Sequence, residues 1–329
     1  MSKRLKHPLH LAFLGCGAVT RKHSKTLRRY RPQLMLYYAS RSEARAQQYC
    51  RQHRGQGWFA SYQQALEDER IDAVLVATPP DQHLELTLRA LEAGKHVIVE
   101  KPPFLKSSDF DRVQQAMARS NRQVMVAENY FYKPLLGCLA RWLEEGRIGD
   151  PMFFLFNALK RQQTGDWRDD PATAGGGALF EGGIHWINFV SNLGFTIQNV
   201  QGYLPGQKSL PEKSMLVAFA YQEGPVGTLF YSWEIPSLFQ GLRISRIFGR
   251  RGSITFESNG VFALVHGYRS ALVFPGFRDI SGYQAMFEDF LQAIAENRQP
   301  RFNLTLARRD VALIEQIYTS LRNQTQNKE

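Results

Sequence analysis

Lys101 is the first residue of the sequence whose setting suggests a chemical role. It follows the run Val97–Val99, and an apolar run without polar alternation predicts a strand buried on both faces of a parallel sheet. Glu100 comes just before Lys101, and Pro102 just after it makes the chain turn. Open α/β sheets bind ligands at the carboxyl ends of their strands. We therefore expect Lys101 in a ligand site, the alternative being a strand-end lysine with no chemical task.

A carboxylate and an imidazole form the second candidate group. Glu181, His185 and Asn188 lie at positions i, i+4 and i+7 of a helix expected over residues 178–193, so they share one face of that helix. Glycines fill positions 175–177, and two more follow Glu181 inside the helix, where each costs roughly 1 kcal/mol relative to alanine. That cost indicates that something packs very close. The alternatives are a structural histidine and an ordinary surface pair.

The stretch that could hold a cofactor lies near the start of the sequence. The apolar run Leu9–Leu14 predicts a strand, Gly15 and Gly17 follow it, and apolar residues then recur at helical spacing. Strand, glycine turn and helix form the context of a dinucleotide-binding loop, in which the backbone approaches a pyrophosphate at the helix N-terminus. Thr20 stands in place of the third glycine. The alternative is a plain turn between a strand and a helix.

The end of the second expected strand indicates which dinucleotide would bind. That strand covers Leu34–Tyr38, and NAD sites usually place an acid after it to hold the ribose 2′-hydroxyl. Here Ser40 and Arg41 follow, and a hydroxyl with a guanidinium suits a 2′-phosphate. We therefore predict a preference for NADP, with NAD as the alternative. The competing interpretation is a helix cap at Ser42 beside surface arginines.

Strands and helices alternate from residue 9 to residue 127, which predicts a doubly wound parallel sheet and a Rossmann-type α/β domain over residues 1–128. After residue 129, successive strands with short turns predict an α+β domain with an open, mostly antiparallel sheet over residues 129–329. Helices are expected at 283–297 and 305–322, and we expect the C-terminal helix to pack back on the first domain.

Composition limits the classes of function. The formal net charge is +11, and residues 1–54 contain 13 Lys or Arg and one acid, Glu43. No helix-turn-helix, zinc finger or RNA-binding pattern accompanies this basic block, so we expect no nucleic-acid partner. The 3 cysteines show neither disulfide nor metal spacing, which indicates a reducing, cytoplasmic location and no metal. No apolar run approaches the roughly 20 residues of a membrane span, so no membrane association is expected.

Several motifs together resemble the Gfo/Idh/MocA oxidoreductases, a family that includes glucose–fructose oxidoreductase and inositol dehydrogenase. The resemblance is carried by the following segments: Gly15–Gly17, Ala77–Pro80 with His83, Gly94–Val97, Glu100–Pro102 and Gly175–His185. It implies a Rossmann domain with a second, sheet-rich domain, an NAD(P) cofactor and sugar or polyol chemistry. The family usually has aspartate where this chain has Glu181, and often where it has Asn188.

Site residues follow from the motifs and the resemblance together. The expected cofactor-binding residues are Gly15, Gly17, Ala18, Val19, Ser40, Arg41, Thr78, Pro79, His83, Glu100 and Lys101. The resemblance implies that Lys101 and His185 are the polar catalytic groups, and Glu181 would orient His185 or bind a substrate hydroxyl. The expected substrate-binding residues are Asn129, Tyr130, Tyr132, Trp167, Arg168 and Asn188, with packing as the alternative role.

Three functions compete at this point. The first is an NAD(P)-dependent oxidoreductase that transfers a hydride between the nicotinamide and a sugar, cyclitol or related carbonyl compound or polyol. The second is a net non-redox reaction on a glycoside through transient oxidation by a tightly held NAD, and the third is a non-catalytic NADP-binding regulator on the same fold. Lys101 and His185 favour an enzyme over a regulator. We also expect a homo-oligomer, a dimer or a tetramer, formed through the antiparallel sheet.

Overall fold

The computed structural model describes residues 7–206, 211–236 and 242–326. Lys3, Arg4 and Lys6 of the basic block lie outside the described residues. The chain divides into two compact units, Met1–Glu128 with Tyr283–Arg308 and Asn129–Gly282 with Arg309–Glu329. Within the described part of the chain, no helix is both long and apolar enough to cross a lipid bilayer.

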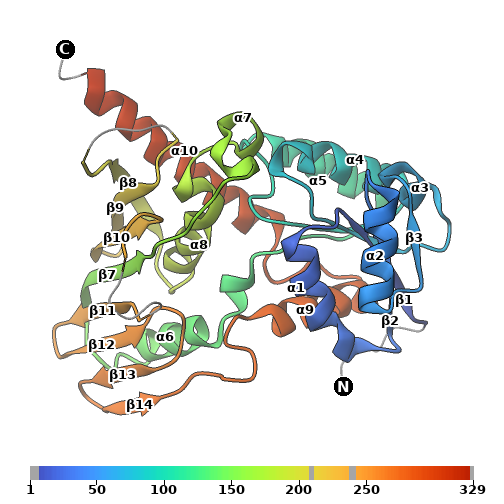
Figure 1. Ribbon diagram of the computed structural model, residues 1–329. Helices are drawn as coiled ribbons and strands as arrows, with labels where there is room; N and C mark the ends of the chain where they lie inside the picture. Colours follow the sequence, from blue (N-terminus) through green and yellow to red (C-terminus); the bar gives the residue numbers. More distant parts are fainter. Residues whose placement is uncertain (1–6, 207–210, 237–241, 327–329) are drawn as a thin grey trace. The chain divides into compact units, whose positions relative to one another are not determined.

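The first unit is built on a six-stranded sheet of strand order β3-β2-β1-β4-β5-β6, and every neighbouring pair is parallel. Its strands are β1 (Leu9–Leu14), β2 (Leu34–Ala39), β3 (Gly57–Phe59), β4 (Ala73–Val76), β5 (His96–Val99) and β6 (Val124–Val126). Its helices are α1 (Ala18–Leu27), η1 (Arg28–Tyr30), α2 (Glu43–His53), α3 (Tyr62–Glu67), η2 (Pro80–Gln82), α4 (His83–Glu92), α5 (Asp109–Ser120) and α9 (Tyr283–Glu296). Figure 1 shows helices on both faces of this sheet. The predicted doubly wound sheet is therefore confirmed, and the short strand β3 was not expected.

Burial explains why the central strands form. The residues of β4 are fully buried, as are Val97, Ile98 and Val99 of β5, because helices cover both faces of the sheet. The strand order reverses between β1 and β4, and in open α/β sheets this switch point is where ligands bind. The glycine loop after β1 and the turn after β4 both begin there.

The segment Tyr283–Arg308 belongs to the first unit, although the sequence placed it in the second domain. Its helix α9 packs against α1. The rings of Tyr283 and Phe287 contact His23 edge-on at centroid distances of 5.4 and 5.1 Å. The Lys22 ammonium donates to the Tyr283 hydroxyl at 3.1 Å. These contacts return the chain to the N-terminal unit before its last helix.

The second unit is built on an eight-stranded sheet of order β14-β13-β12-β11-β7-β10-β9-β8. Its strands are β7 (Pro151–Leu159), β8 (Ile197–Tyr203), β9 (Ser214–Tyr221), β10 (Val226–Ser232), β11 (Ile244–Gly249), β12 (Gly252–Glu257), β13 (Ala263–His266) and β14 (Ala271–Val273). Strands β7 and β10 are parallel and the other pairs antiparallel, which confirms the mostly antiparallel sheet. Strand β8 was not expected.

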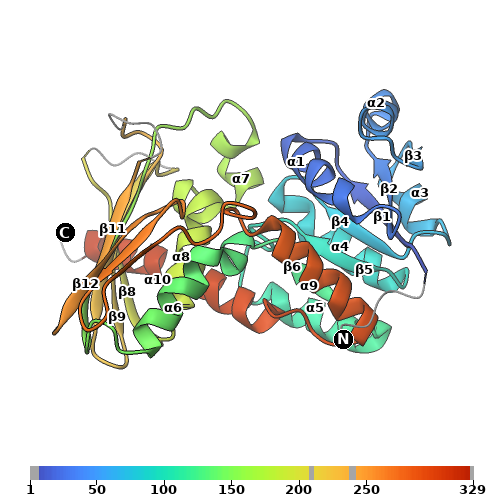
Figure 2. The same ribbon diagram turned by 90° about the horizontal axis from the view of Figure 1, so that it is seen from below.

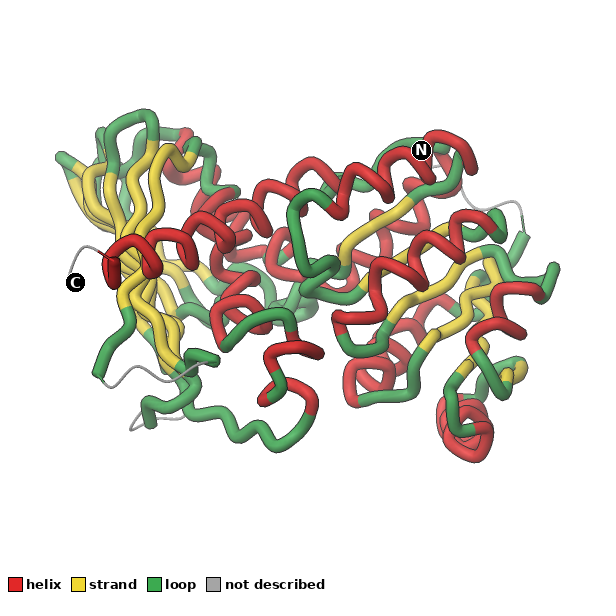
Figure 3. The backbone as a smooth tube through the Cα atoms, turned by 90° about the horizontal axis from the view of Figure 1, so that it is seen from above, coloured by secondary structure: helices red, strands yellow, loops and turns green. Residues whose placement is uncertain are grey.

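Helices cover one face of this sheet, as Figures 2 and 3 show. They are η3 (Asn129–Tyr132), α6 (Pro134–Glu144), η4 (Trp167–Asp169), α7 (Pro171–Ala174), the π-helical turn η5 (Leu179–Gly183), α8 (Ile184–Ser191) and the part of α10 (Leu304–Gln326) that belongs to this unit. Alternate residues of β9 point toward the helices and are buried. The expected helix over 178–193 thus begins with a π turn and becomes α-helical only at Ile184.

Candidate active site

The glycine loop after β1 has the geometry that a dinucleotide requires. Gly15 has φ +115°, and a Cβ there would lie 2.6 Å from the Ala77 carbonyl oxygen, so only glycine fits. A Cβ on Gly17 would meet no atom within 4 Å, which leaves open space above the backbone. Gly17 precedes α1, whose first amides have no side-chain cap. An uncapped helix start of this kind is suited to a pyrophosphate.

Thr20 explains how the loop manages without a third glycine. Its side chain is fully buried, and its hydroxyl donates to the Gly15 carbonyl at 2.7 Å. The hydroxyl of Ser24, one turn later, donates to the Thr20 carbonyl at 2.7 Å. The helix and the turn are therefore tied together by side-chain hydroxyls.

Ser40 and Arg41 directly follow β2, as the sequence predicted. Ser40 is buried, and its Oγ accepts a hydrogen bond from the Ser42 amide at 3.2 Å. Arg41 is exposed and lies close to the Tyr62 hydroxyl. Burial raises the pKa of Tyr62, and the charge of Arg41 offsets part of that rise. Ser42 caps α2 through Arg45, so the capping interpretation also holds.

His83 has a different role from the cofactor contact that the sequence suggested. Its ring is fully buried, with Nε2 at 2.8 Å from the Thr78 carbonyl and Nδ1 at 2.9 Å from the Pro102 carbonyl. Burial lowers the pKa of His83, and the two backbone carbonyls oppose this effect. His83 thus joins the turn after β4 to the turn after β5. Thr78 Oγ1 is buried without a partner in the described part of the chain, and Pro79 leads into η2.

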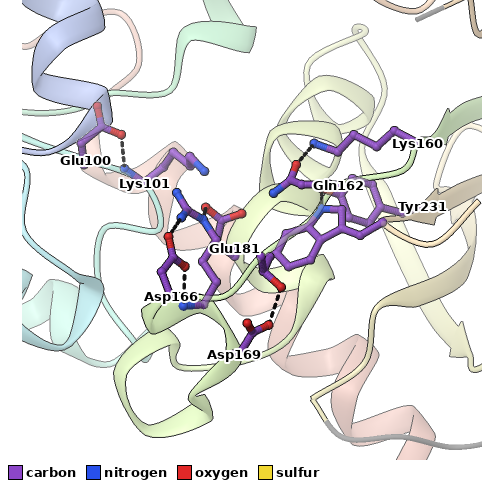
Figure 4. Close-up of polar contacts among 11 residues, drawn as sticks. Glu100, Lys101, Lys160, Gln162, Asp166, Asp169, Glu181 and Tyr231 are labelled. Atoms are coloured by element: carbon purple, nitrogen blue, oxygen red, sulfur yellow. Dashed lines mark hydrogen bonds and ion pairs between the residues drawn. The ribbon is translucent and has the colours of Figure 1, made fainter. Parts of the chain in front are cut away.

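Glu100, predicted as a cofactor contact, is buried, and both of its carboxylate oxygens have partners within the first unit. One of its oxygens forms an ion pair with His23 Nε2. The other accepts a hydrogen bond from the Lys101 amide at 3.2 Å (Figure 4). Burial opposes its ionisation, but His23, Lys101 and His83 outweigh burial and keep the pKa of Glu100 below its ordinary value. Lys101, half-buried at the end of β5, therefore lies beside a buried negative charge. The sequence did not reveal the role of His23, which looked only like part of a helical pattern.

In the second unit, Glu181 lies in the π turn and is 6% exposed. Arg168 Nε donates to it at 3.1 Å, and the same guanidinium also pairs with Asp166. Figure 4 shows the Asp166 and Glu181 side chains close to each other. Arg168 also lies over the Trp167 ring at 4.6 Å. Arg168 thus fixes a carboxylate, which differs from the direct substrate contact that the sequence suggested.

His185 lies in the first turn of α8, the α-helical part of the same helix. Its ring stacks on Tyr130 with centroids 4.5 Å apart and planes 13° from parallel. The Lys133 ammonium lies 4.5 Å from the centroid of Tyr130. The imidazole is half-buried and supported on one face, which suits a group that must hold one orientation while it exchanges a proton.

The interior glycines have the cause that the sequence indicated. A Cβ on Gly182 would collide with the Tyr231 hydroxyl. That hydroxyl is buried and accepts a hydrogen bond from Trp233 Nε1 at 2.9 Å. Burial, followed by the charge of Glu181, raises the pKa of Tyr231 well above its ordinary value. The π turn therefore packs directly on β10.

Three residues expected to contact substrate are structural. Asn129 is 3% exposed and donates to the Ser281 carbonyl at 2.6 Å. Tyr132 is 6% exposed and packs edge-on against Phe131. Asn188 is fully buried and donates to Asp310 of α10 at 2.7 Å, so it does not share an open face with His185.

Lys160 and Gln162 are polar residues of the second unit that the sequence did not single out. They continue from the end of β7, and the Lys160 ammonium donates to Gln162 Oε1 at 2.5 Å (Figure 4). Polar residues in an irregular segment after a strand have no spacing that would identify them. Among the described residues, no three His, Cys, Asp or Glu side chains lie together in a way that could hold a metal ion.

Comparison with known proteins agrees with this geometry. Residues 9–128 match the model described as "Oxidoreductase family, NAD-binding Rossmann fold", and residues 138–255 match the GFO/IDH/MocA C-terminal domain. The chain is thus an NAD-binding oxidoreductase with a Rossmann domain. It belongs to the Gfo/Idh/MocA family, as the motifs predicted.

Curated relatives include oxidoreductase P35 of Formosa agariphila, which is 23% identical over 76% of this chain and 79% of its own length. Levoglucosan dehydrogenase of Pseudarthrobacter phenanthrenivorans is 28% identical over 65% of this chain, which spans 58% of that protein. The NAD(+)-dependent scyllo-inositol 2-dehydrogenase of Bacillus subtilis is 27% identical over 46% of this chain and 44% of its own length. The fold is similar to that of a solved levoglucosan dehydrogenase in complex with NADH and levoglucosan, with a TM-score of 0.85, 21% identity and coverage of 96% and 98% of the two chains.

Proposed function

We propose that this protein oxidises a CH–OH group of a sugar, cyclitol or polyol, or reduces the corresponding carbonyl, with a nicotinamide cofactor. The observation that carries the proposal is the helix start at 179–185, where an arginine-paired carboxylate and a stacked imidazole are fixed within one turn. Relatives named as levoglucosan and inositol dehydrogenases support the substrate class.

The chemistry divides between cofactor and protein. The nicotinamide, when bound, accepts the hydride from the carbinol carbon or returns it. The protein must then take the hydroxyl proton, and we assign that task to Lys101 and His185. Glu181, held by Arg168, is placed to orient His185 or to accept a substrate hydroxyl. Tyr130 stacks on one face of the His185 imidazole, and the Arg168 guanidinium packs on the Trp167 ring.

A screen of sugars, cyclitols and polyols tests the activity directly. Absorbance of the reduced nicotinamide is followed with each compound, and we expect turnover with at least one of them. Release of an aglycone without net change in reduced cofactor would instead select the non-redox glycoside reaction. Binding of cofactor and sugar without turnover of either would select the regulator.

The proposed cofactor is NADP(H), with NAD as the alternative. The support is the exposed Arg41 beside Ser40, because these two residues, and not a carboxylate, directly follow β2. Arg41→Ala should weaken NADPH binding by roughly 1–3 kcal/mol and leave NADH binding nearly unchanged. Arg51→Ala, which removes an exposed arginine from the other end of α2, is the matched control. Calorimetry that finds NADH bound more tightly than NADPH by the wild type would overturn the preference.

We further propose a homo-oligomer formed through the open face of the eight-stranded sheet. Phe153, Leu155, Val226 and Phe230 of β7 and β10 are 51%, 40%, 43% and 37% exposed, beside a shallow apolar hollow of about 510 Å³. An exposed apolar patch of this kind usually marks an interaction surface. Light scattering should give a dimer or tetramer for the wild type and a smaller species for Phe153→Glu. Trp58→Glu, at a 40% exposed residue of the first unit, should leave the mass unchanged.

The remaining proposals are a cytoplasmic location and the absence of nucleic-acid and membrane partners. Three free cysteines support the location, and burial raises the pKa of the Cys16 thiol to about 12, which keeps it unreactive. Mobility shifts with duplex DNA and RNA should show only weak binding that collapses as salt rises. Fractionation of the cells that make the protein should recover it without membranes.

A further inference from the structure

The helix that carries Glu181 and His185 begins at amides whose partners lie elsewhere in the chain. The Ala178 amide donates to the Glu212 carbonyl at 2.7 Å, and the Leu179 amide donates to Glu212 Oε1 at 2.9 Å. Glu212 lies just before β9, far from the helix in sequence. A single residue therefore fixes the amide just before the π turn and the first amide within it.

Tyr318 of α10 completes this arrangement. Its hydroxyl donates to Glu212 Oε1 at 2.8 Å and accepts the Gly177 amide at 3.3 Å. A Cβ on Gly177 would collide with the Glu212 carboxylate, so the glycine entry admits this close approach. Glu212 and Tyr318 together join the glycines at 175–177, the π turn, the start of β9 and α10.

The setting of Glu212 shows what its side chain contributes. It is 3% exposed, burial raises its pKa, and no cation pairs with it in the described residues. A buried carboxyl without a cation is costly, so its contribution lies in the hydrogen bonds that it accepts. Glutamine, which keeps one acceptor oxygen, should be able to replace it.

We propose that Glu212 and Tyr318 are positioning residues that hold the π turn open and so place Glu181 against Arg168. The inference rests on the proposed dehydrogenase function for its effect on rate. Without the Glu212 side chain, the Leu179 amide loses its acceptor, and the turn is free to rewind toward α-helical geometry, which rotates Glu181 away from Arg168. The Asn188–Asp310 bond still ties α8 to α10, so the loss stays local to the turn.

The test compares Glu212→Ala, Glu212→Gln and Tyr318→Phe, with Glu223→Gln and Tyr268→Phe as exposed matched controls. Hydrogen exchange of peptides covering 178–185 should be about tenfold faster or more in Glu212→Ala, less so in Tyr318→Phe, and unchanged in Glu212→Gln and both controls. With a substrate in hand, Glu212→Ala should lower kcat by about 10- to 100-fold at unchanged NADPH affinity, and Glu212→Gln should restore most of it.

Each outcome decides the proposal. Unchanged exchange in Glu212→Ala, an unchanged kcat despite faster exchange, or a Glu212→Gln variant as impaired as Glu212→Ala would overturn it. If Glu212→Ala does not fold, Tyr318→Phe removes one hydroxyl and supplies both measurements. If the wild type turns over no substrate, the dehydrogenase proposal fails, while hydrogen exchange still decides whether the two residues hold the turn.

Discussion

The glycine loop of the first unit and the π turn of the second unit each hold candidate site residues in fixed positions, but by different interactions. After β1, Gly15 has a positive φ and lies against the Ala77 backbone, and the first amides of α1 have no side-chain cap. At the π turn, Gly182 meets a tyrosine hydroxyl, and side chains hold the reactive groups: Arg168 holds Glu181, and Tyr130 supports His185. The glycine loop of the first unit, the backbone half of this comparison, is thus fixed mainly by backbone conformation, with Thr20 tying it to α1. The π turn of the second unit, the side-chain half, is fixed mainly by side chains.

The largest expected effect concerns the proton. Lys101→Met and His185→Ala should each lower the single-turnover rate of hydride transfer by about 10²–10⁴-fold, while NADPH affinity stays nearly intact. If both residues serve the same proton, the double mutant loses far less than the product of the single losses. Lys25→Met, at an exposed lysine of α1, is the control. A wild-type rate in Lys101→Met would mean that the lysine is not the proton-handling group.

Substitution of the two loop glycines tests the backbone half. Gly15→Ala should lower the free energy of unfolding by about 1–3 kcal/mol, because the new Cβ meets the Ala77 carbonyl and φ is +115°. Gly17→Ala has no such obstacle, so its stability should stay within about 0.5 kcal/mol of wild type, while NADPH binding weakens. Chemical denaturation and calorimetry measure the two effects. Equal stability of both variants would show that the loop is not fixed by Gly15.

The side-chain half should behave differently, because its obstacle can be removed. Gly182→Ala alone should cost about 1–2 kcal/mol of stability through contact with the Tyr231 hydroxyl. Tyr231→Phe removes that oxygen, so in the double mutant the alanine should cost at least about 1 kcal/mol less. A double-mutant cycle in denaturant measures this coupling. Simple additivity would indicate that the π turn does not rest on Tyr231.

The smallest expected effect is a difference in how pH acts on the two units. Burial, with Arg122, lowers the pKa of His96 to about 4. Between pH 6.5 and about 4, the unfolded chain therefore binds a proton at His96 that the folded first unit does not bind. The free energy of unfolding should fall on acidification, by about 1 kcal/mol from pH 6 to pH 5. Burial raises the pKa of Glu212, so its contribution is present below the ordinary glutamate pKa and is lost as pH rises through the folded value. His96→Gln and Glu212→Gln should each flatten one profile. Hydrogen exchange corrected for intrinsic rates should show acid weakening the first unit relative to the second.

The sequence predicted the backbone half well, because its signals are local. A glycine that must adopt positive φ, an apolar run without alternation and a proline after Lys101 each restrict the chain at their own position. The same reasoning found Glu181 and His185. It could not predict that His23 pairs with Glu100 or that Thr20 bonds to Gly15, because the spacing of residues in a helix does not reveal their hydrogen-bond partners.

Errors arose where distant segments decide the role of a residue. Asn188 has helical spacing from His185, but Asp310 binds it inside the core. Asn129 follows a strand end, but it bonds to Ser281. His83 and Glu100 stand in binding motifs, yet their polar atoms hold the turns behind the site. Such partners come from tertiary contacts, which no local pattern encodes.

The π turn also bears on how this site can evolve. A π turn contains one residue more than the α-helical turn that it replaces, and it absorbs that residue without shifting the helix beyond it. Glu181 lies within the turn, while His185 lies in the α-helical register that follows. A deletion in the turn would therefore move the carboxylate around the helix axis, and a change of acid would alter its reach, while either would leave the imidazole in place. The two groups can therefore diverge separately, so under the proposed function this turn is a place where new substrate preferences can arise without rebuilding the helix.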